Sequence, residues 1–350
     1  EDWYDLTNFY ADVGDDGLEP RRFRNWNRGN EDIEYCFAHR VADRAIETMR
    51  QFAAAENPLF LAVEFDEPHG PYICPPPFRN QFDYEDIYRP PTMNASLDGK
   101  PRIQQNYAAF LRAGRDNPED LPRYYEYYYN CNAYVDHEIG RVIAAVRRHL
   151  PADTVIIYTS DHGDHLGSFG LCAKGPTMYD LTCAVPLIID APGLTQSGRR
   201  ETSLVSGVDV FATILDLAGA AANHAGKATD AHSVVPVLQG DSSQHRDAVF
   251  IEYNRFGQGA HQAGGFFPIR CIRTDCWKLA VNLFDIDELY DLADDPLETR
   301  NLINDPQMAD IRNGLHDQLL TWQRTTCDVF RGPPWAQRPW RHDLAQVFEG

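Results

Sequence analysis

The sequence lacks any long apolar run, and it has no excess of basic residues. No stretch approaches the about 20 apolar residues that a helix needs to cross a bilayer, so no membrane-spanning segment is predicted. The 32 Lys and Arg residues are outnumbered by 52 Asp and Glu residues, for a formal net charge of -20. Because nucleic acids and anionic membrane surfaces repel such a chain, neither is expected as a partner.

Paired cysteines are also absent. The eight cysteines are scattered without any CxxC pair, which argues against a zinc ribbon and a disulfide framework and favours a reducing compartment. The opening stretch "EDWYDLTNFY" has neither the basic nor the apolar region of a signal peptide. These features predict a cytoplasmic protein.

The residues that are present predict a folded α/β protein with a second, smaller domain. Up to about residue 240, helical patterns (38–52 and 122–150) alternate with apolar runs typical of strands (59–65, 154–159 and 185–190). This alternation indicates a mainly parallel sheet layered with helices. Beyond it come "AVFIEY", "IRCIRTD" and "CWKLAV", then a helical pattern from about 308, which predict a small antiparallel sheet and a closing helix. We therefore expect a main domain at 1–240 and a subdomain at 241–350.

One segment combines a strand with polar side chains, "TVIIYTSDHGDHLGSFGL" from Thr154 to Leu171. Asp161 and His162 follow the strand directly, and ligands of open α/β sheets bind outside the carboxyl ends of strands. A carboxylate beside an imidazole suits a divalent cation, and Gly163 permits a sharp turn. Taken by itself, Asp-His-Gly is equally typical of a capped turn.

The surrounding sequence resembles a known family over most of residues 35–305. "SDHGDHLGSFGLCAKGPTMYDLTCAVPLIIDAPG" is similar to the metal-and-lysine segment of the sulfatase family, within the alkaline phosphatase superfamily. "NPLFLAVEFDEPHGPYICPPPF" resembles its Pro-His-x-Pro substrate loop, and "IRTDCWKLAVN…DELYDLADDPLETRNL" resembles its C-terminal hairpin. The resemblance implies an alkaline-phosphatase-like sandwich, with a mainly parallel sheet between helices and a small C-terminal antiparallel sheet with a helix.

The resemblance also implies roles for individual residues. Asp161 and His162 match two ligands of the family's divalent cation, with calcium expected first and manganese or magnesium as alternatives. Lys174 matches the lysine that contacts an ester oxygen, and His69 matches the histidine that protonates the leaving oxygen. Positive charge and a proton donor are what a tetrahedral ester needs as its bond breaks. His165 and Phe169 are expected to line the pocket.

The nucleophile that the family uses is missing from the matched segments. Sulfatases use a formylglycine made from a C/S-x-P/A-x-R motif, together with two adjacent metal-binding aspartates. The one formal match, "CFAHR" at Cys36, lies in a helical pattern without the family's following residues, so we interpret it as chance. We therefore expect an N-terminal polypeptide to carry the nucleophile and both aspartates, and this chain to be incomplete without it. A separate front segment keeps a periplasmic or secreted location open.

Three functions remain to be compared. The leading prediction is a metal-dependent, arylsulfatase-like hydrolase of sulfate esters. A phosphonate monoester hydrolase or phosphodiesterase of the same superfamily keeps the fold and changes the ester. A non-catalytic subunit or fragment is the alternative from another class. The sequence leaves the alcohol part of the substrate open, as well as whether the chain forms a homo-oligomer.

Overall fold

The computed structural model describes residues 33–55, 57–70, 72, 74–83, 85, 87–113, 120–195, 198–220, 230–256 and 265–342. The chain divides into two compact units, each described here by itself. Unit 1 comprises Glu1–Arg89 and Ala113–Thr154, and unit 2 comprises Pro90–Arg112 and Val155–Gly350. Among the described helices, none is both long and apolar enough to cross a membrane.

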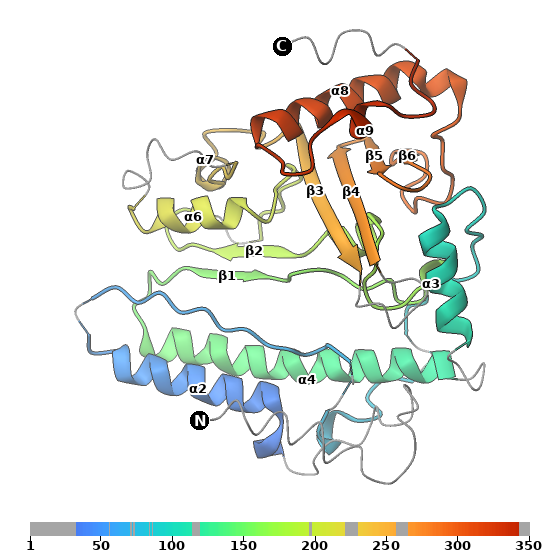
Figure 1. Ribbon diagram of the computed structural model, residues 1–350. Helices are drawn as coiled ribbons and strands as arrows, with labels where there is room; N and C mark the ends of the chain where they lie inside the picture. The colour runs from blue at the N-terminus through green and yellow to red at the C-terminus, as the bar shows by residue number, and fades with distance from the viewer. Residues whose placement is uncertain are drawn as a thin grey trace. The chain divides into compact units, whose positions relative to one another are not determined.

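Unit 1 is built on two packed helices, α2 (Phe37–Phe52) and α4 (Asp120–His149), which lie along each other in Figure 1. Ala42, Ala45 and Met49 of α2 pack against Val142 and Ala145 of α4. Short turns of 3-10 helix, η1 (Ile33–Tyr35) and η2 (Pro76–Phe78), precede and follow α2. Both long helices match the predicted ones. The predicted strand at 59–65 is extended but pairs with no strand in the described residues, and its side chains are alternately exposed and partly buried.

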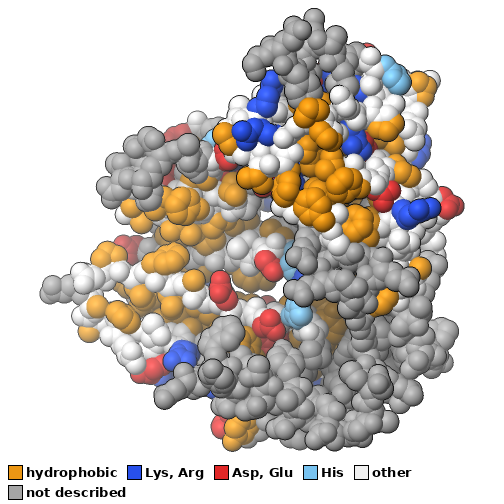
Figure 2. All heavy atoms as spheres, viewed as in Figure 1, with side chains coloured by type: hydrophobic (Ala, Val, Ile, Leu, Met, Phe, Trp, Pro, Cys, Tyr) orange, Lys and Arg blue, Asp and Glu red, His pale blue; other side chains and the backbone are white. Residues whose placement is uncertain are grey.

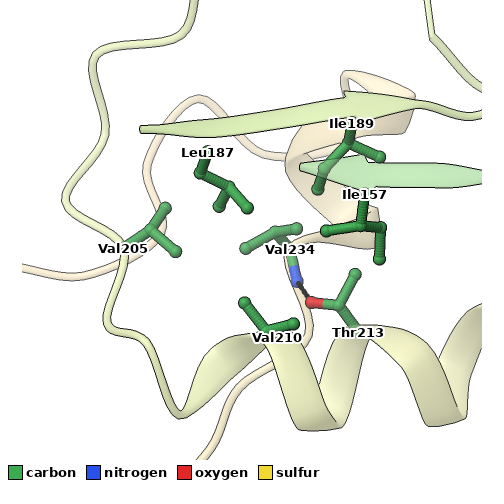
Figure 3. A pocket seen from close by; sticks show the side chains of 7 residues that line it. All are labelled: Ile157, Leu187, Ile189, Val205, Val210, Thr213 and Val234. Atoms are coloured by element: carbon green, nitrogen blue, oxygen red, sulfur yellow. Dashed lines mark hydrogen bonds between the residues drawn. The ribbon is translucent and has the colours of Figure 1, made fainter. Parts of the chain in front are cut away.

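Unit 2 begins with α3 (Arg102–Ala113) and contains a two-stranded sheet, β1 (Ile156–Thr159) with β2 (Leu187–Asp190). Helix α6 (Asp209–Leu217) and the start of α7 (Val235–Gln239) lie against one face of it, leaving an apolar gap (Figure 3). The gap is lined by Ile157, Leu187, Ile189, Val205, Val210, Thr213 and Val234. The Val234 amide donates to Thr213 Oγ1 at 3.0 Å, which ties α7 to α6. Thr213 is the one polar side chain among the residues that line this gap.

Strand pairing differs from the mainly parallel sheet that we predicted. β1 and β2 run antiparallel, with Ile157 opposite Ile189, and every strand pair in the described part of the chain is antiparallel. The prediction assumed that a helix between the strands returns the chain to a parallel position. The connection instead contains only η3 (Ser168–Gly170) and the one-turn helix α5 (Asp180–Cys183), and the chain re-enters the sheet in the opposite direction.

The predicted C-terminal sheet is confirmed. Its strands are β3 (Ala248–Phe256), β4 (Gly265–Thr274), β5 (Trp277–Asn282) and β6 (Glu288–Asp291), paired antiparallel in that order. They are followed by η5 (Pro306–Met308), α8 (Ala309–Thr325) and α9 (Pro333–Ala336). Figure 1 shows α8 lying across this sheet. The closing helix begins one residue from the predicted position at 308.

This sheet is buried on both faces. Successive residues of a strand point to opposite sides of the sheet, so each strand contributes side chains to two buried clusters. On one side Ile272, Leu279, Val281 and Leu289 pack with Leu315, Leu319 and Trp335 of α8 and α9. On the other side Ile269, Cys271 and Ala280 contact Met178, which belongs to the connection between β1 and β2. The C-terminal sheet therefore supports the loop in which most of the candidate site residues lie.

Leu319 provides a test of the α8 side of the core. Leu319 is fully buried, whereas Ile311 on the same helix is partly exposed. We expect Leu319→Ala to lower the free energy of unfolding by about 2–5 kcal/mol, because the cavity adds to the lost burial. The matched change Ile311→Ala should cost less than about 1 kcal/mol. Urea unfolding followed by tryptophan fluorescence measures both, and equal losses would contradict this packing.

Candidate functional site

The first part of the candidate site is the pair Asp161 and His162, directly after β1. Asp161 Oδ1 accepts from the His162 backbone amide at 2.8 Å, and Asp161 Oδ2 lies 3.2 Å from His162 Nε2. His162 Nδ1 lies 2.9 Å from the carbonyl oxygen of Gly163. Because a carbonyl only accepts, Nδ1 carries a proton, and Nε2 is left facing the carboxylate.

This geometry fits a bound cation. Two atoms that each lie ~2.2 Å from one ion at right angles are ~3.1 Å apart, close to the observed separation of Oδ2 and Nε2. Histidine ligands of metals commonly donate their other N–H to a carbonyl or carboxylate, as His162 Nδ1 does. Without a cation between them, the unprotonated Nε2 of His162 and the Asp161 carboxylate would place two hydrogen-bond acceptors against each other. Within the described residues no three His, Cys, Asp or Glu side chains form a metal-binding group. The pair by itself offers two donor atoms, Asp161 Oδ2 and His162 Nε2.

Gly163 fixes this pair against helix α5. Its amide donates to the Thr182 carbonyl at 3.0 Å. A Cβ placed on Gly163 would lie 2.0 Å from the backbone oxygen of Leu181, a distance that no real contact reaches. The close approach of two backbones, rather than an unusual φ, is what requires glycine here.

Lys174 is brought near the same turn by a folded loop. Asp164 Oδ1 accepts from the amides of Leu166 (2.8 Å) and Ala173 (3.0 Å), and the His165 amide donates to the Ala173 carbonyl at 2.9 Å. Lys174 follows immediately and is exposed. Among the described residues its ammonium group has no hydrogen-bond or ion-pair partner. It is therefore available to an anionic ligand.

The backbone around Lys174 is held from the other side by α3. The hydroxyl of Tyr107 donates to the Cys172 carbonyl at 3.0 Å and lies 3.4 Å from the Lys174 carbonyl. A Cβ on Gly175 would come within 3.0 Å of the Tyr107 ring. The Tyr107 ring therefore packs directly against the backbone of Gly175.

His165 is completely buried. Its Nε2 lies 3.0 Å from Thr177 Oγ1, and its Nδ1 has no hydrogen-bond partner among the described residues. Burial lowers the pKa of His165 to about 3, so the ring is neutral at physiological pH. His165 was predicted to line the pocket, and the structure places it in the interior beneath the loop.

Phe169 is also interior, although it too was predicted to line the pocket. It is fully buried with φ 58° and stacks on Tyr179 at a centroid distance of 4.8 Å. The ammonium group of Lys100 lies 5.1 Å from this ring, 5.1 Å from that of Tyr179 and 4.3 Å from that of Tyr290. Burial lowers the pKa of Lys100 to about 8. This cation–π cluster anchors the loop rather than a ligand.

His69 lies in unit 1, in the loop after the extended segment. It is exposed, its backbone amide donates to the Asp66 carbonyl at 2.9 Å, and its Nδ1 lies 2.8 Å from the carbonyl of Gly70. The carbonyl again requires the proton on Nδ1, so Nε2 is the nitrogen that can exchange a proton with a ligand. The structure brings together Asp161, His162 and Lys174 within one loop region of unit 2, with His69 in the other unit.

Cys36 does not have the surroundings of a nucleophile. It precedes α2 directly and is buried in unit 1 with Cys74 and Tyr134. Burial raises the pKa of its thiol to about 11, which disfavours the reactive thiolate. All eight cysteines are free.

Sequence reasoning missed the charged residues that hold α5. Lys278 of β5 is fully buried and bonds to Asp180, the first residue of α5, and to Glu298. A lysine in the apolar run "CWKLAV" was the available signal. It could not be interpreted, because the pattern does not reveal that both faces of the sheet are buried.

The fold belongs to a known class of ester hydrolases. The crystal structure of the phosphonate monoester hydrolase of Agrobacterium radiobacter superposes with a TM-score of 0.67 and 26% identity, over 84% of this chain and 63% of that one. This likeness confirms the alkaline-phosphatase-like architecture. The sulfatase family model matches residues 1–220, and the model for the C-terminal part of N-sulphoglucosamine sulphohydrolase matches residues 167–325. The chain belongs to the sulfatase family.

Two relatives show how much of a sulfatase the chain spans. The uncharacterized sulfatase YidJ of Escherichia coli K12 is 34% identical over 99% of this chain and 68% of its own length. The choline-sulfatase of Rhizobium meliloti is 31% identical over 72% of this chain and 48% of its own length. The chain therefore corresponds to about half to two thirds of these proteins.

Gly163→Ala tests the contact between the Asp161–His162 turn and α5. Because the new Cβ overlaps the Leu181 carbonyl, we expect a loss of about 1–3 kcal/mol in the free energy of unfolding and a displaced turn. Gly207, which has open space around it and no positive φ, provides the control Gly207→Ala. Thermal unfolding measures both, and an unchanged midpoint for Gly163→Ala would disprove the close approach.

His165 gives a pH-dependent prediction. Its folded pKa of about 3 lies below the ordinary 6.5, so between these values the unfolded chain holds the extra proton. Its contribution to stability is complete above pH 6.5 and is lost as pH falls towards 3, by up to ~1.4 kcal/mol per pH unit. His165→Gln should therefore show a shallower loss between pH 6 and 4. The exposed His342, changed to Gln, is the control, and identical pH profiles for wild type and His165→Gln would contradict the burial.

Proposed function

We propose that this chain contributes the metal-binding and ester-binding residues of a sulfate-ester hydrolase that depends on a divalent cation. The observation that carries the proposal is the facing of Asp161 Oδ2 and His162 Nε2 at 3.2 Å, in a chain of the sulfatase family. Choline-sulfatase, among the relatives, supports a sulfate ester as the substrate.

Asp161 and His162 would hold the cation, with calcium preferred and manganese or magnesium as alternatives. When bound, such an ion stabilises negative charge on the ester oxygens. The Gly163 carbonyl keeps the His162 ring in the tautomer that presents Nε2, and α5 keeps the turn in place. A rigid turn is needed because catalysis depends on groups that are already in position when charge develops.

Lys174 and His69 would act on the ester itself. The Lys174 ammonium, exposed and without a partner in the described residues, would bind a peripheral sulfate oxygen. His69, with its Nδ1 proton engaged by Gly70, would act in the doubly protonated form: it would give the Nε2 proton to the leaving oxygen as the bond to sulfur breaks, and become the neutral ring. An exposed loop histidine suits this role, since the proton must be replaced from solvent.

The nucleophile of this proposal is not assigned to a residue of this chain. A formylglycine is the family's solution, and Cys36, which is buried in unit 1 with Cys74 and Tyr134, is not exposed to an ester. We retain the prediction that a separate N-terminal polypeptide carries it. Gel analysis of the natural protein, purified through a tag on this chain, tests that prediction by the presence or absence of a second polypeptide.

A phosphonate ester remains the second candidate substrate. The likeness to the phosphonate monoester hydrolase favours it, and the same cation, lysine and histidine would serve a phosphonate oxyanion equally well. Paired assays of the natural protein with 4-nitrophenyl sulfate and a matched phosphonate monoester separate the two. A higher kcat/KM for the sulfate ester supports the leading function. A higher kcat/KM for the phosphonate ester would instead identify the chain as part of a phosphonate monoester hydrolase.

Direct titration tests the cation site without substrate. We expect calcium or manganese to bind the natural protein, and His162→Ala or Asp161→Asn to weaken its affinity by at least about tenfold, because each change removes a ligand. His149→Ala, in α4 of unit 1, is the control. Binding that is unchanged in both site variants would exclude Asp161 and His162 as ligands.

Turnover tests the ester-binding residues. We expect Lys174→Ala to lower kcat/KM by about 100-fold, the usual effect of removing one charge from a transition-state oxyanion site. Cys36→Ala should retain activity, since this residue is not assigned a chemical role. If Cys36→Ala abolishes turnover in a folded protein, the interpretation of the "CFAHR" match as chance is wrong.

A further inference from the structure

A buried charge cluster lies beneath the site loop, and the proposed function does not use it. The Lys278 ammonium donates to Asp180 Oδ1 at 2.6 Å, to Glu298 Oε1 at 2.6 Å and to the Met178 carbonyl at 2.8 Å. An ammonium group has three protons, so all of them are used. Lys278 and Glu298 are almost completely buried, whereas Asp180 is about one third exposed. At its outer edge Arg273 contacts Asp180 Oδ2 at 3.2 Å.

The cluster binds the one-turn helix α5 at its first residue, Asp180. Besides its bond to Lys278, Glu298 uses its second oxygen, Oε2, to accept from the Asp180 backbone amide at 2.7 Å. Both the side chain and the backbone of Asp180 are therefore fixed by residues of the C-terminal sheet and the turn that follows it. Two later residues of α5, Leu181 and Thr182, are those that contact Gly163.

The same cluster reaches the lysine side of the site. Met178, whose carbonyl accepts from Lys278, lies four residues after Lys174 on one continuous segment. The Lys174 segment is thus held at one end by Asp164 and Tyr107 and at the other by Lys278. Both parts of the candidate site in unit 2 are therefore connected, through Asp180 and Met178, to one buried ammonium group.

The cost of this arrangement indicates a role beyond stability. Buried ion pairs are often no more stabilising than well-packed apolar side chains, because desolvation offsets the attraction. Glu298 is also held at a φ of 54°, an uncommon and strained conformation for a residue other than glycine. What charged groups provide, and apolar ones do not, is a single orientation for each hydrogen-bonded partner.

We propose that Lys278 and Glu298 are positioning residues, which set the places of the Asp161–His162 pair and of Lys174 through helix α5. They touch neither substrate nor cation. This inference rests on the proposed function for its catalytic consequence, whereas its structural part is independent of it.

The test compares two buried charged contacts on opposite faces of one sheet. Glu298→Gln keeps the side-chain shape, but an amide offers only one oxygen for two donors, the Lys278 ammonium and the Asp180 amide. Asp328→Asn is the matched control, because Asp328 pairs with buried Arg270 at 2.7 Å on β4. Hydrogen exchange by mass spectrometry is followed in peptides spanning 160–166, 172–180 and 309–325.

We expect Glu298→Gln to speed exchange at least about tenfold in the two site peptides, with little change in the α8 peptide. Asp328→Asn should leave the site peptides unchanged. In the natural protein, Glu298→Gln should lower kcat more than it raises KM. Equal effects of both variants on all peptides, or no effect of Glu298→Gln on 160–166, would overturn the proposal.

A milder variant keeps the test decisive if Glu298→Gln does not fold. Arg273→Gln removes the outer contact to Asp180, together with the bond from Arg273 to the Thr274 carbonyl, and leaves Lys278 and Glu298 unchanged. We expect exchange in 160–166 to rise by a few-fold, and no rise would also count against the proposal. Exchange needs no substrate. A wild type that is inactive on both esters but shows the expected exchange would refute the proposed function and leave the positioning role intact.

Discussion

The buried ammonium of Lys278 is the contact on which the arrangement of the site depends. It joins a strand of the C-terminal sheet to the first residue of α5 and to the Met178 carbonyl. Burial by itself lowers the pKa of Lys278, but the carboxylates of Glu298 and Asp180 outweigh that effect and keep the lysine charged. A charged lysine without these partners could not remain in this interior, so the cluster and the loop position are determined together.

The two buried faces of the C-terminal sheet explain why a sheet that lacks the proposed catalytic residues matters to them. One face forms an apolar core with α8. On the outside of this part of unit 2, Figure 2 shows hydrophobic side chains gathered on the visible surface. The other face carries Lys278, which bonds to Asp180 of the loop, and also Tyr290 and Glu288, which bond to Lys100 and to Gln104 of α3. Polar groups are tolerated there because nearly every one has a partner.

Local sequence patterns located individual turns and strands better than the packing around them. The Asp161–His162 turn, Lys174 and the C-terminal strands were predictable because each has a local signature: a strand end, a family motif or an alternating pattern. The antiparallel pairing of β1 with β2 was not, since direction depends on where the chain goes between them. His165 and Phe169 were expected in the pocket. Their burial follows from the backward fold of the loop at Leu166 (φ 46°) and Ala173 (φ 56°), which no local pattern reveals.

The central claim is that Asp161 and His162 together bind a divalent cation. A crystal structure of the natural protein soaked in manganese, with anomalous scattering recorded, tests it most directly. The account predicts an anomalous peak within bonding distance of both Asp161 Oδ2 and His162 Nε2, with Nδ1 still bonded to the Gly163 carbonyl. A peak bound elsewhere, with Asp161 and His162 still paired to each other at 3.2 Å, would contradict it.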